Sequence, residues 1–224
     1  MNIGIIGQGF VGTAVNEGLK PKFNVETYDI AKESTCSSLE EIASKCDTLF
    51  VCLPTPMDKT TGKCHINIVE KVLSDLNQIN KCNLIIVKST IPPGTTKYWN
   101  EKFSNIDVVF NPEFLTEANA IEDFKNQNRI LIGGPRPAST KARRIFAKAF
   151  PKVKIIKTDS TYAEMVKYVT NCFLATKVAF ANEMYQMCES IGADYDKVIE
   201  YATFDERLGK SHWNVPGPDG DFGF

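Results

Sequence analysis

The chain opens with Met1-Asn2-Ile3-Gly4-Ile5-Ile6-Gly7-Gln8-Gly9-Phe10-Val11-Gly12, in which a short apolar run leads directly into three closely spaced glycines. Residues 2–6 are typical of a buried strand, and the spacing of apolar residues over 11–19 predicts a helix immediately after the glycines. A second run over 24–29 predicts another strand, which ends on Asp29. This order of elements predicts a βαβ unit with parallel strands at the start of the protein.

The same alternation continues through the first two thirds of the chain. Further strands are predicted over 48–53, 84–88, 108–111, 130–132 and 153–157, and further helices over 39–44, 66–79, 95–103 and 140–150. Strands and helices that alternate this often indicate a mostly parallel sheet with helices on both faces and right-handed crossovers. The predicted fold class is therefore α/β, a Rossmann-type doubly wound sheet, with a first domain over residues 1–158.

After the last predicted strand the pattern changes. Residues 160–191 contain no Gly or Pro, and a continuous helix over them would be roughly 48 Å long. Thr161 and Glu164 predict a capping box at its start, and Gly192 is placed to end it. Because one domain cannot cover so long a helix, we expect it to join two bodies or to pack against a second copy. Residues 159–224 are thus predicted to form a long connecting helix and a small helical dimerisation region.

The long helix carries many apolar residues: Met165, Val166, Val169, Phe173, Leu174, Val178, Phe180, Met184 and Met187. Core packing is the usual explanation for such a surface. The length of the helix favours a two-fold homodimer interface along residues 160–191. A further helix is expected over residues 193–207, followed by a loop rich in Gly and Pro over 215–224.

The glycines and the acidic residue at the end of the second strand predict a dinucleotide site. Gly7 and Gly9 allow a tight turn and a close approach of the backbone to a diphosphate, and Gly12 allows close packing of the helix. Phe10 and Val11 open a helix whose free N–H groups attract the anion. Asp29 accepts hydrogen bonds from ribose hydroxyls and repels a 2′-phosphate, so the predicted cofactor is NAD. The alternative is a glycine turn with an unrelated surface aspartate.

Four further segments end or follow predicted strands or lie on the long helix. They are Pro54-Thr55-Pro56, Ser89-Thr90-Ile91-Pro92-Pro93-Gly94, Asn111-Pro112-Glu113-Phe114-Leu115-Thr116-Glu117, and the pair Lys167 and Asn171. Open α/β sheets bind ligands at the carboxyl ends of their strands. Lys167 and Asn171 are four residues apart and share one helix face. Ordinary turn chemistry and solvated charges are the alternative explanations for these segments.

Composition limits the classes of function. Lys and Arg number 26 against 27 Asp and Glu, so the formal charge of −1 argues against a protein that coats nucleic acid. No signal peptide and no apolar run of about 18 residues is found, so no membrane partner is expected. Seven scattered cysteines without a Cys-x-x-Cys pair predict reduced thiols and a cytoplasmic location. Cys64-His65 has no second pair at ligand spacing, so no metal site is predicted.

Taken together, these segments resemble the UDP-glucose/GDP-mannose dehydrogenase family over nearly the whole chain. The similarity extends to Asn182-Glu183 and Asp205-Glu206-Arg207-Leu208-Gly209. It implies NAD-dependent oxidation of the primary alcohol of a nucleotide sugar, of the UDP-glucose type, to the acid in two steps. It also implies these positions: Pro54, Thr55, Thr90 and Glu117 near NAD; Glu113, Phe114, Leu115, Lys167 and Asn171 around the sugar; and Arg207 in a neighbouring subunit's site.

The resemblance also implies roles for the catalytic residues. A hydride leaves the carbinol carbon only as its hydroxyl loses a proton, and the Lys167 ammonium beside the Asn171 amide would stabilise the resulting negative charge. Thr90 and Glu113 would order or deprotonate a water molecule for the later hydrolysis step.

The chain departs from the family at its end, Asp221-Phe222-Gly223-Phe224. Family members continue there with a Gly-Gly-x-Cys segment, whose thiol captures the aldehyde, and with a third domain that binds the nucleotide. Either the natural protein is longer or this is a shortened homologue, and the ending inside a motif favours the longer protein. We expect the chain as written to bind NAD without converting a sugar to its acid.

Two other functions are compatible with the same features. A two-domain β-hydroxyacid dehydrogenase also pairs an NAD(P) domain with a long helix bearing Lys-x-x-x-Asn, and it needs no catalytic cysteine. A non-catalytic NAD-binding or assembly module would keep the glycine turn alone. The segments over 89–94 and 111–117 favour the sugar-nucleotide enzymes over both alternatives.

Overall fold

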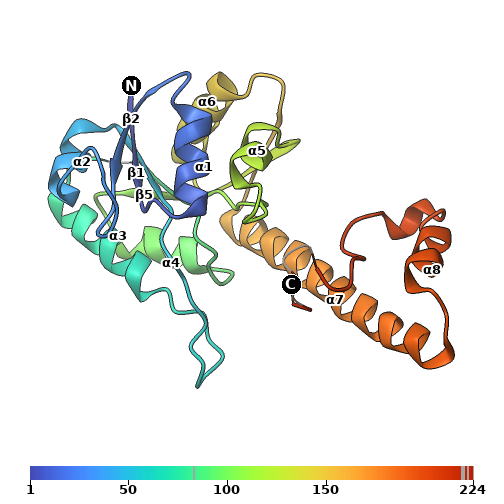
Figure 1. The fold of residues 1–224 in the computed structure, drawn as a ribbon. Helices are drawn as coiled ribbons and strands as arrows, with labels where there is room; N and C mark the ends of the chain where they lie inside the picture. The colour runs from blue at the N-terminus through green and yellow to red at the C-terminus, as the bar shows by residue number, and fades with distance from the viewer. Residues whose placement is uncertain (83, 218–219, 221, 224) are drawn as a thin grey trace. The chain divides into compact units, whose positions relative to one another are not determined.

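The computed structural model describes residues 1–82, 84–217, 220 and 222–223. Within them, one sheet contains seven strands in the order β2-β1-β3-β4-β5-β6-β7 (Figure 1). The strands are β1 (Asn2–Ile6), β2 (Asn24–Tyr28), β3 (Thr48–Val51), β4 (Leu84–Val87), β5 (Asp107–Phe110), β6 (Arg129–Gly133) and β7 (Lys154–Thr158). All neighbouring pairs are parallel except β5 and β6. The predicted mostly parallel, doubly wound α/β fold is confirmed.

Helices alternate with the strands along the chain. They are α1 (Phe10–Leu19), α2 (Leu39–Lys45), α3 (Asn67–Ile79), α4 (Thr95–Lys102), α5 (Ala120–Lys125), α6 (Ala138–Ala149), α7 (Ser160–Ile191) and α8 (Tyr195–Ala202), with a 3₁₀ turn at Glu206–Leu208. Two separate cores lie on the two faces of the sheet. Residues of α2, α3 and α4 contribute to one core, and residues of α1, α5 and α6 contribute to the other.

The interior strand β3 explains why both faces need helices. Leu49 and Val51 belong to one core and Phe50 to the other, because successive side chains of a strand point to opposite faces. All three are fully buried. The Phe50 ring packs edge to face with Phe146 of α6, and the two ring centroids lie 5.8 Å apart. Three consecutive buried apolar residues in one strand are typical of a parallel sheet covered on both faces.

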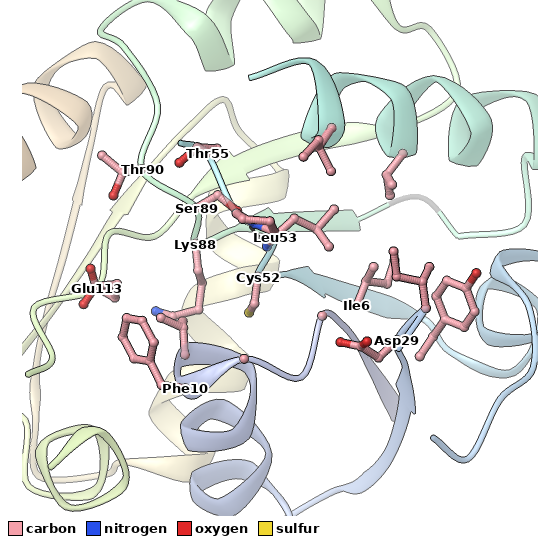
Figure 2. Close-up of a pocket in the computed structure, with 18 of the residues that line it drawn as sticks. Ile6, Phe10, Asp29, Cys52, Leu53, Thr55, Lys88, Ser89, Thr90 and Glu113 are labelled. Atoms are coloured by element: carbon pink, nitrogen blue, oxygen red, sulfur yellow. Dashed lines mark hydrogen bonds between the residues drawn. The ribbon is translucent and has the colours of Figure 1, made fainter. Parts of the chain in front are cut away.

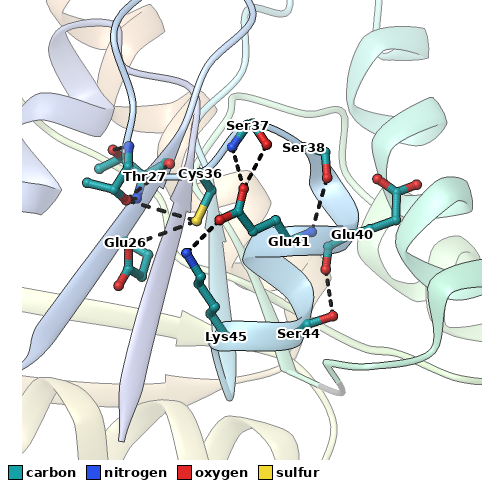
Figure 3. A network of polar contacts seen from close by, with 10 residues as sticks. Glu26, Thr27, Cys36, Ser37, Ser38, Glu40, Glu41, Ser44 and Lys45 are labelled. Atoms are coloured by element: carbon teal, nitrogen blue, oxygen red, sulfur yellow. Dashed lines mark hydrogen bonds and ion pairs between the residues drawn. The ribbon is translucent and has the colours of Figure 1, made fainter.

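Helix α2 begins at a capping arrangement of side chains (Figure 3). The Ser38 hydroxyl accepts a hydrogen bond from the backbone N–H of Glu41 at 3.1 Å. The Glu41 carboxylate in turn accepts from the backbone N–H and hydroxyl of Ser37 and from the Lys45 ammonium at 2.6 Å. The bond to Ser38 satisfies a backbone donor that the first helical turn would otherwise leave unpaired, and the other bonds fix the Glu41 side chain beside it.

The chain order places a crevice at the carboxyl ends of β1 and β3. From β1 the first crossover leads to β2 on one side, whereas the chain then returns to β3 on the other side. At such a switch point the connections diverge and leave room for a ligand beyond the strand ends. The turn over residues 7–9 lies at this position, directly after β1.

Two details differ from the sequence-based predictions. The short helix α5 was not predicted, because six residues are less than two helical turns and show no clear periodicity. The capping box at Thr161 and Glu164 is wrong, because α7 already begins at Ser160 and the Asp159 carboxylate accepts from the N–H of Thr161 at 2.8 Å. Glu164 instead accepts from the backbone N–H groups of Gly94 and Thr96, at 2.6 and 2.8 Å.

Helix α7 runs without interruption over the predicted residues and ends before Gly192, whose φ of 70° is left-handed as expected for a helix-ending glycine. The chain divides into two compact units, Met1–Lys167 and Tyr168–Phe224. In the second unit, the Tyr195 hydroxyl of α8 donates to the Trp213 carbonyl at 2.6 Å. The division between residues 158 and 159 stays a prediction. Among the described residues, no helix combines the length and apolar character needed to cross a bilayer.

Glu164 supplies the structural prediction. Its side chain is fully buried and accepts two backbone N–H donors, so Glu164→Ala should leave both donors without a partner and lower the free energy of unfolding by about 2–3 kcal/mol. Denaturant unfolding would measure this. Glu189→Ala removes an exposed carboxylate from the same helix and should change stability by less than about 0.5 kcal/mol. Equal losses of unfolding free energy in the two variants would contradict the role of Glu164 as a buried hydrogen-bond acceptor.

Candidate functional site

The turn between β1 and α1 requires glycine at two positions. Gly7 has a φ of +90°, and a Cβ there would lie 2.4 Å from the carbonyl oxygen of Cys52. A Cβ at Gly12 would lie 1.8 Å from the carbonyl oxygen of Gly7. Any larger side chain at either position would therefore force the turn, the first helix or β3 to move. These two glycines serve the shape of the protein itself.

Gly9 is different, because no protein atom lies within 4 Å of the place where its Cβ would be. Its φ of −68° is also accessible to any residue. Gly9 is the N-cap of α1, and in the described part of the chain no side chain caps that helix. Open space beside N–H groups that point out of a helix end fits the diphosphate of a dinucleotide.

Asp29 follows β2 at the edge of the same crevice. One carboxylate oxygen accepts from the N–H of Gln8 at 2.6 Å, and the other accepts from the N–H groups of Ala31 and Lys32 at 2.8 and 3.1 Å. Burial alone would raise the pKa of Asp29, but these hydrogen bonds and the Lys32 charge outweigh it and lower the pKa. Asp29 is therefore held as an anion next to the glycine turn, as recognition of ribose hydroxyls requires.

A cavity of about 620 Å³ connects these features with the ends of β3, β4 and β5 (Figure 2). Nine of the predicted site residues line it: Gly7, Gly9, Phe10, Val11, Asp29, Pro54, Thr55, Thr90 and Glu113. Figure 2 shows Asp29 at one end and Glu113 with Thr90 at the other. The cavity is thus extended, with the glycine turn between a ribose-type site and a group of polar side chains.

A buried ion pair lies at the Glu113 end. The Lys167 ammonium donates to the Glu113 carboxylate at 2.5 Å and to the Glu113 backbone carbonyl at 2.7 Å. Lys167 is 4% exposed, and the second Glu113 oxygen accepts from the N–H of Leu115 at 2.7 Å. The first turns of α7 are thereby tied to the loop after β5, and an ammonium group is held beside the cavity.

The remaining predicted residues have more varied positions. The Phe114 ring stacks with the Arg129 guanidinium at 4.7 Å and faces the Lys167 ammonium at 5.7 Å. Leu115 packs against the core, and Glu117 is exposed. Asn171 and Arg207 belong to the second unit, where the Arg207 guanidinium is paired with Asp205 at 2.5 Å. Their placement relative to the cavity stays a prediction.

Lys88 is a cavity residue that sequence reasoning did not select. It follows β4 directly, is 3% exposed and lines the cavity. Its ammonium donates to the side-chain and backbone oxygens of Asn111, at 2.9 and 3.4 Å. A charged residue that directly ends an apolar strand was the available signal. Among the described residues, His, Cys, Asp and Glu form no cluster of three suited to a metal ion.

The two kinds of glycine lead to opposite expectations. Gly9→Ala should fold with unchanged stability, because its Cβ meets no protein atom, and should weaken NAD binding about tenfold or more, because the methyl group occupies the diphosphate's approach. Gly12→Ala should instead lower stability. Calorimetric NAD titration and thermal unfolding would measure both effects. Tight NAD binding by Gly9→Ala would place the diphosphate elsewhere.

Comparisons with known proteins match two segments of the chain to models of one family. Residues 25–150 match the model of the NAD-binding domain of the UDP-glucose/GDP-mannose dehydrogenase family, and residues 161–221 match the model of its central domain. A UDP-glucose 6-dehydrogenase of Rickettsia prowazekii is 36% identical over 179 residues, covering 77% of this chain and 41% of that protein. The chain thus spans less than half the length of this relative.

Solved structures agree with the fold. A UDP-glucose dehydrogenase of Pyrobaculum islandicum superimposes with a TM-score of 0.84 at 26% identity, covering 95% of this chain and 58% of that one. A GDP-mannose dehydrogenase of Pseudomonas aeruginosa reaches 0.81 at 23% identity, covering 96% and 59%, and supports the fold alone. With its glycine turn, Asp29 and two matched domains, the chain belongs to the UDP-glucose/GDP-mannose dehydrogenase family, and NAD is its cofactor.

Proposed function

We propose that the protein catalyses NAD-dependent oxidation of the primary alcohol of a sugar nucleotide of the UDP-glucose type. The observation that supports this most directly is the buried Lys167–Glu113 pair beside the NAD cavity. An ammonium group held out of water next to a carboxylate suits the chemistry of an alcohol that must lose a proton and a hydride.

Each residue of this group has a proposed task. The Lys167 ammonium stabilises the negative charge that develops on the substrate oxygen, which is worth most where water is excluded. Glu113 and Thr90 hold and deprotonate a water molecule in the later hydrolysis step. NAD, when bound, accepts the hydride, and Gly9, Asp29 and the start of α1 hold its diphosphate and ribose.

The proposal includes further predicted residues. Asn171 lies one helical turn after Lys167 on α7, so its amide joins the ammonium on one face. Pro54, Thr55 and Glu117 are proposed to contact NAD, and Phe114 and Leu115 the sugar. Arg207 is proposed to reach the nucleotide-sugar site of a neighbouring subunit.

The organisation of the protein is part of the proposal. Residues 1–158 are proposed to be the NAD-binding domain and residues 159–224 the connecting and dimerisation region. Exposed apolar side chains along α7 support a homodimer through 160–191: Met165, Val166, Val169, Phe173, Phe180, Met187 and Ile191. All seven cysteines are free thiols, which supports the proposed cytoplasmic location.

Substitution of Lys167 tests the catalytic proposal. In the polypeptide encoded by the full reading frame, Lys167→Met should lower the rate of NADH formation with UDP-glucose about 100-fold or more, because the developing charge loses its counter-ion. NADH affinity should change by less than about threefold, because Lys167 lies outside the diphosphate and ribose sites and the reduced nicotinamide ring is neutral. Absorbance of NADH and calorimetry would measure the two quantities.

A control variant and a comparison of several substrates distinguish the proposed function from the two alternative functions. Lys197→Met removes an exposed ammonium from α8 and should leave turnover unchanged. Oxidation of small 3-hydroxy acids in place of UDP-glucose or GDP-mannose would favour a β-hydroxyacid dehydrogenase. Tight NAD binding without turnover of any substrate would favour a non-catalytic NAD-binding module.

The dimer proposal has a separate test. Val169 and Phe173 are 62% and 68% exposed and lie one turn apart on α7, so Phe173→Glu should place a charge in the proposed interface and shift the protein to monomers. Light scattering at several concentrations would measure the mass. Glu189→Gln is the control on the same helix. A wild-type protein that is monomeric throughout would contradict the proposal.

A further inference from the structure

Lys88 is a buried charge for which the proposed chemistry has no use. It is 3% exposed, and within the described residues both hydrogen-bond partners of its ammonium are neutral oxygens of Asn111. The Asn111 amide donates onward to the Leu131 carbonyl at 2.7 Å, which fixes its orientation. Burial of an ammonium with only neutral partners is costly, so this arrangement needs a compensating reason.

The charges around Lys88 leave a positive excess at this end of the cavity. Glu113 after β5 and Lys167 of α7 act on Lys88 through their charges, whereas the buried Cys52 thiol after β3 is neutral. The Glu113 carboxylate is already bonded to Lys167 and to the Leu115 N–H. From α5, the Phe124 ring faces the Lys88 ammonium at 5.5 Å. The carboxylate of Glu113 therefore faces two ammonium groups, those of Lys88 and Lys167, and is bonded to Lys167.

The shape of the cavity indicates which half of NAD meets this charge. Asp29 marks the adenosine ribose and Gly9 the diphosphate, so the remaining half of the cofactor extends toward the ends of β4 and β5. Figure 2 shows Lys88 on the Glu113 side of the cavity, away from Asp29. The nicotinamide half and Lys88 thus share one end of the cavity.

We propose that Lys88 makes the site discriminate between the two redox forms of the cofactor, favouring NADH over NAD⁺. The oxidised nicotinamide ring carries a positive charge, and the reduced ring is neutral. When the carbinol carbon gives up its hydrogen with both bonding electrons, the ring gains the hydride and loses that charge, while the hydroxyl proton leaves to solvent. A nearby buried ammonium repels only the oxidised ring, so it favours hydride acceptance.

The protonation of Lys88 gives the inference a pH dependence. Burial lowers the pKa of Lys88 to about 8, with partial compensation from the Glu113 carboxylate and a further lowering by Lys167. The lysine is therefore mainly charged below this pH and mainly neutral above it. Burial raises the pKa of the Cys52 thiol to about 12, so that neighbour stays neutral across the same range.

The experiment compares dissociation constants and needs no turnover. Calorimetry or NADH fluorescence gives the ratio of Kd for NAD⁺ to Kd for NADH in the wild type and in Lys88→Gln, which keeps a donor toward Asn111 without the charge. At about pH 7 this ratio should be about fivefold or more lower in the variant. In the wild type the ratio should fall between about pH 7 and about pH 9, and in Lys88→Gln it should stay constant.

A matched control separates this effect from a general loss of positive charge. Lys32 lines the same cavity at the Asp29 end, where its ammonium donates to the Gln8 carbonyl at 2.6 Å. Lys32→Gln should weaken both redox forms equally, because their adenosine halves are identical. Lys88→Arg keeps the charge and should keep the wild-type ratio.

The outcomes separate this inference from the function on which it rests. An equal change in both constants for Lys88→Gln would make Lys88 a purely structural residue and overturn the inference. If that variant fails to fold, a wild-type ratio that is constant between about pH 7 and about pH 9 would overturn it instead. Failure to oxidise any sugar nucleotide, with the ratio behaving as expected, would count against the proposed function alone.

Discussion

The carbonyl oxygen of Gly7 lies where a Cβ at position 12 would have to be, only 1.8 Å away. This close approach lets α1 begin directly after β1 and aim its uncapped N–H groups into the crevice between β1 and β3. This contact leaves no room for a side chain at position 12, whereas the open space at Gly9 is available to a ligand. One turn therefore serves two purposes, since two of its glycines shape the protein and the third leaves room for the cofactor.

Electrostatics at the other end of the cavity depend on contacts between distant parts of the chain. Glu113 follows β5, Lys88 follows β4, and Lys167 lies in the third turn of α7. Glu164, one turn earlier, holds that helix against the Gly94 and Thr96 N–H groups at the start of α4. The buried carboxylate at position 164 thus helps to fix the position of the ammonium at 167, so helix docking and site geometry have a common origin.

Most of the sheet was predictable because each strand is a short apolar run bounded by polar or turn residues. β1 was predicted residue for residue, and the other strands differ by one or two residues at their ends. The reversed direction of β6 and β7 relative to β5 was not predictable, since apolar periodicity carries no information about strand direction. Helix α5 and the side chain that caps α7 were missed, because a short helix and a helix cap depend on one or two side chains whose partners lie elsewhere.

The sequence by itself determined the glycine turn, the acidic residue at the end of β2 and the uninterrupted α7, because each depends on residues close together in the chain. The positive φ of Gly7 shapes only its own turn. The absence of Gly and Pro over 160–191 lets the helix continue through those same residues. Only the tertiary structure decided that Lys88 and Glu113 line one cavity, that Lys167 pairs with Glu113, and that Lys88 is buried against Asn111. Burial and the neighbourhood of charges arise when separate strands and helices pack, so no local pattern encodes them.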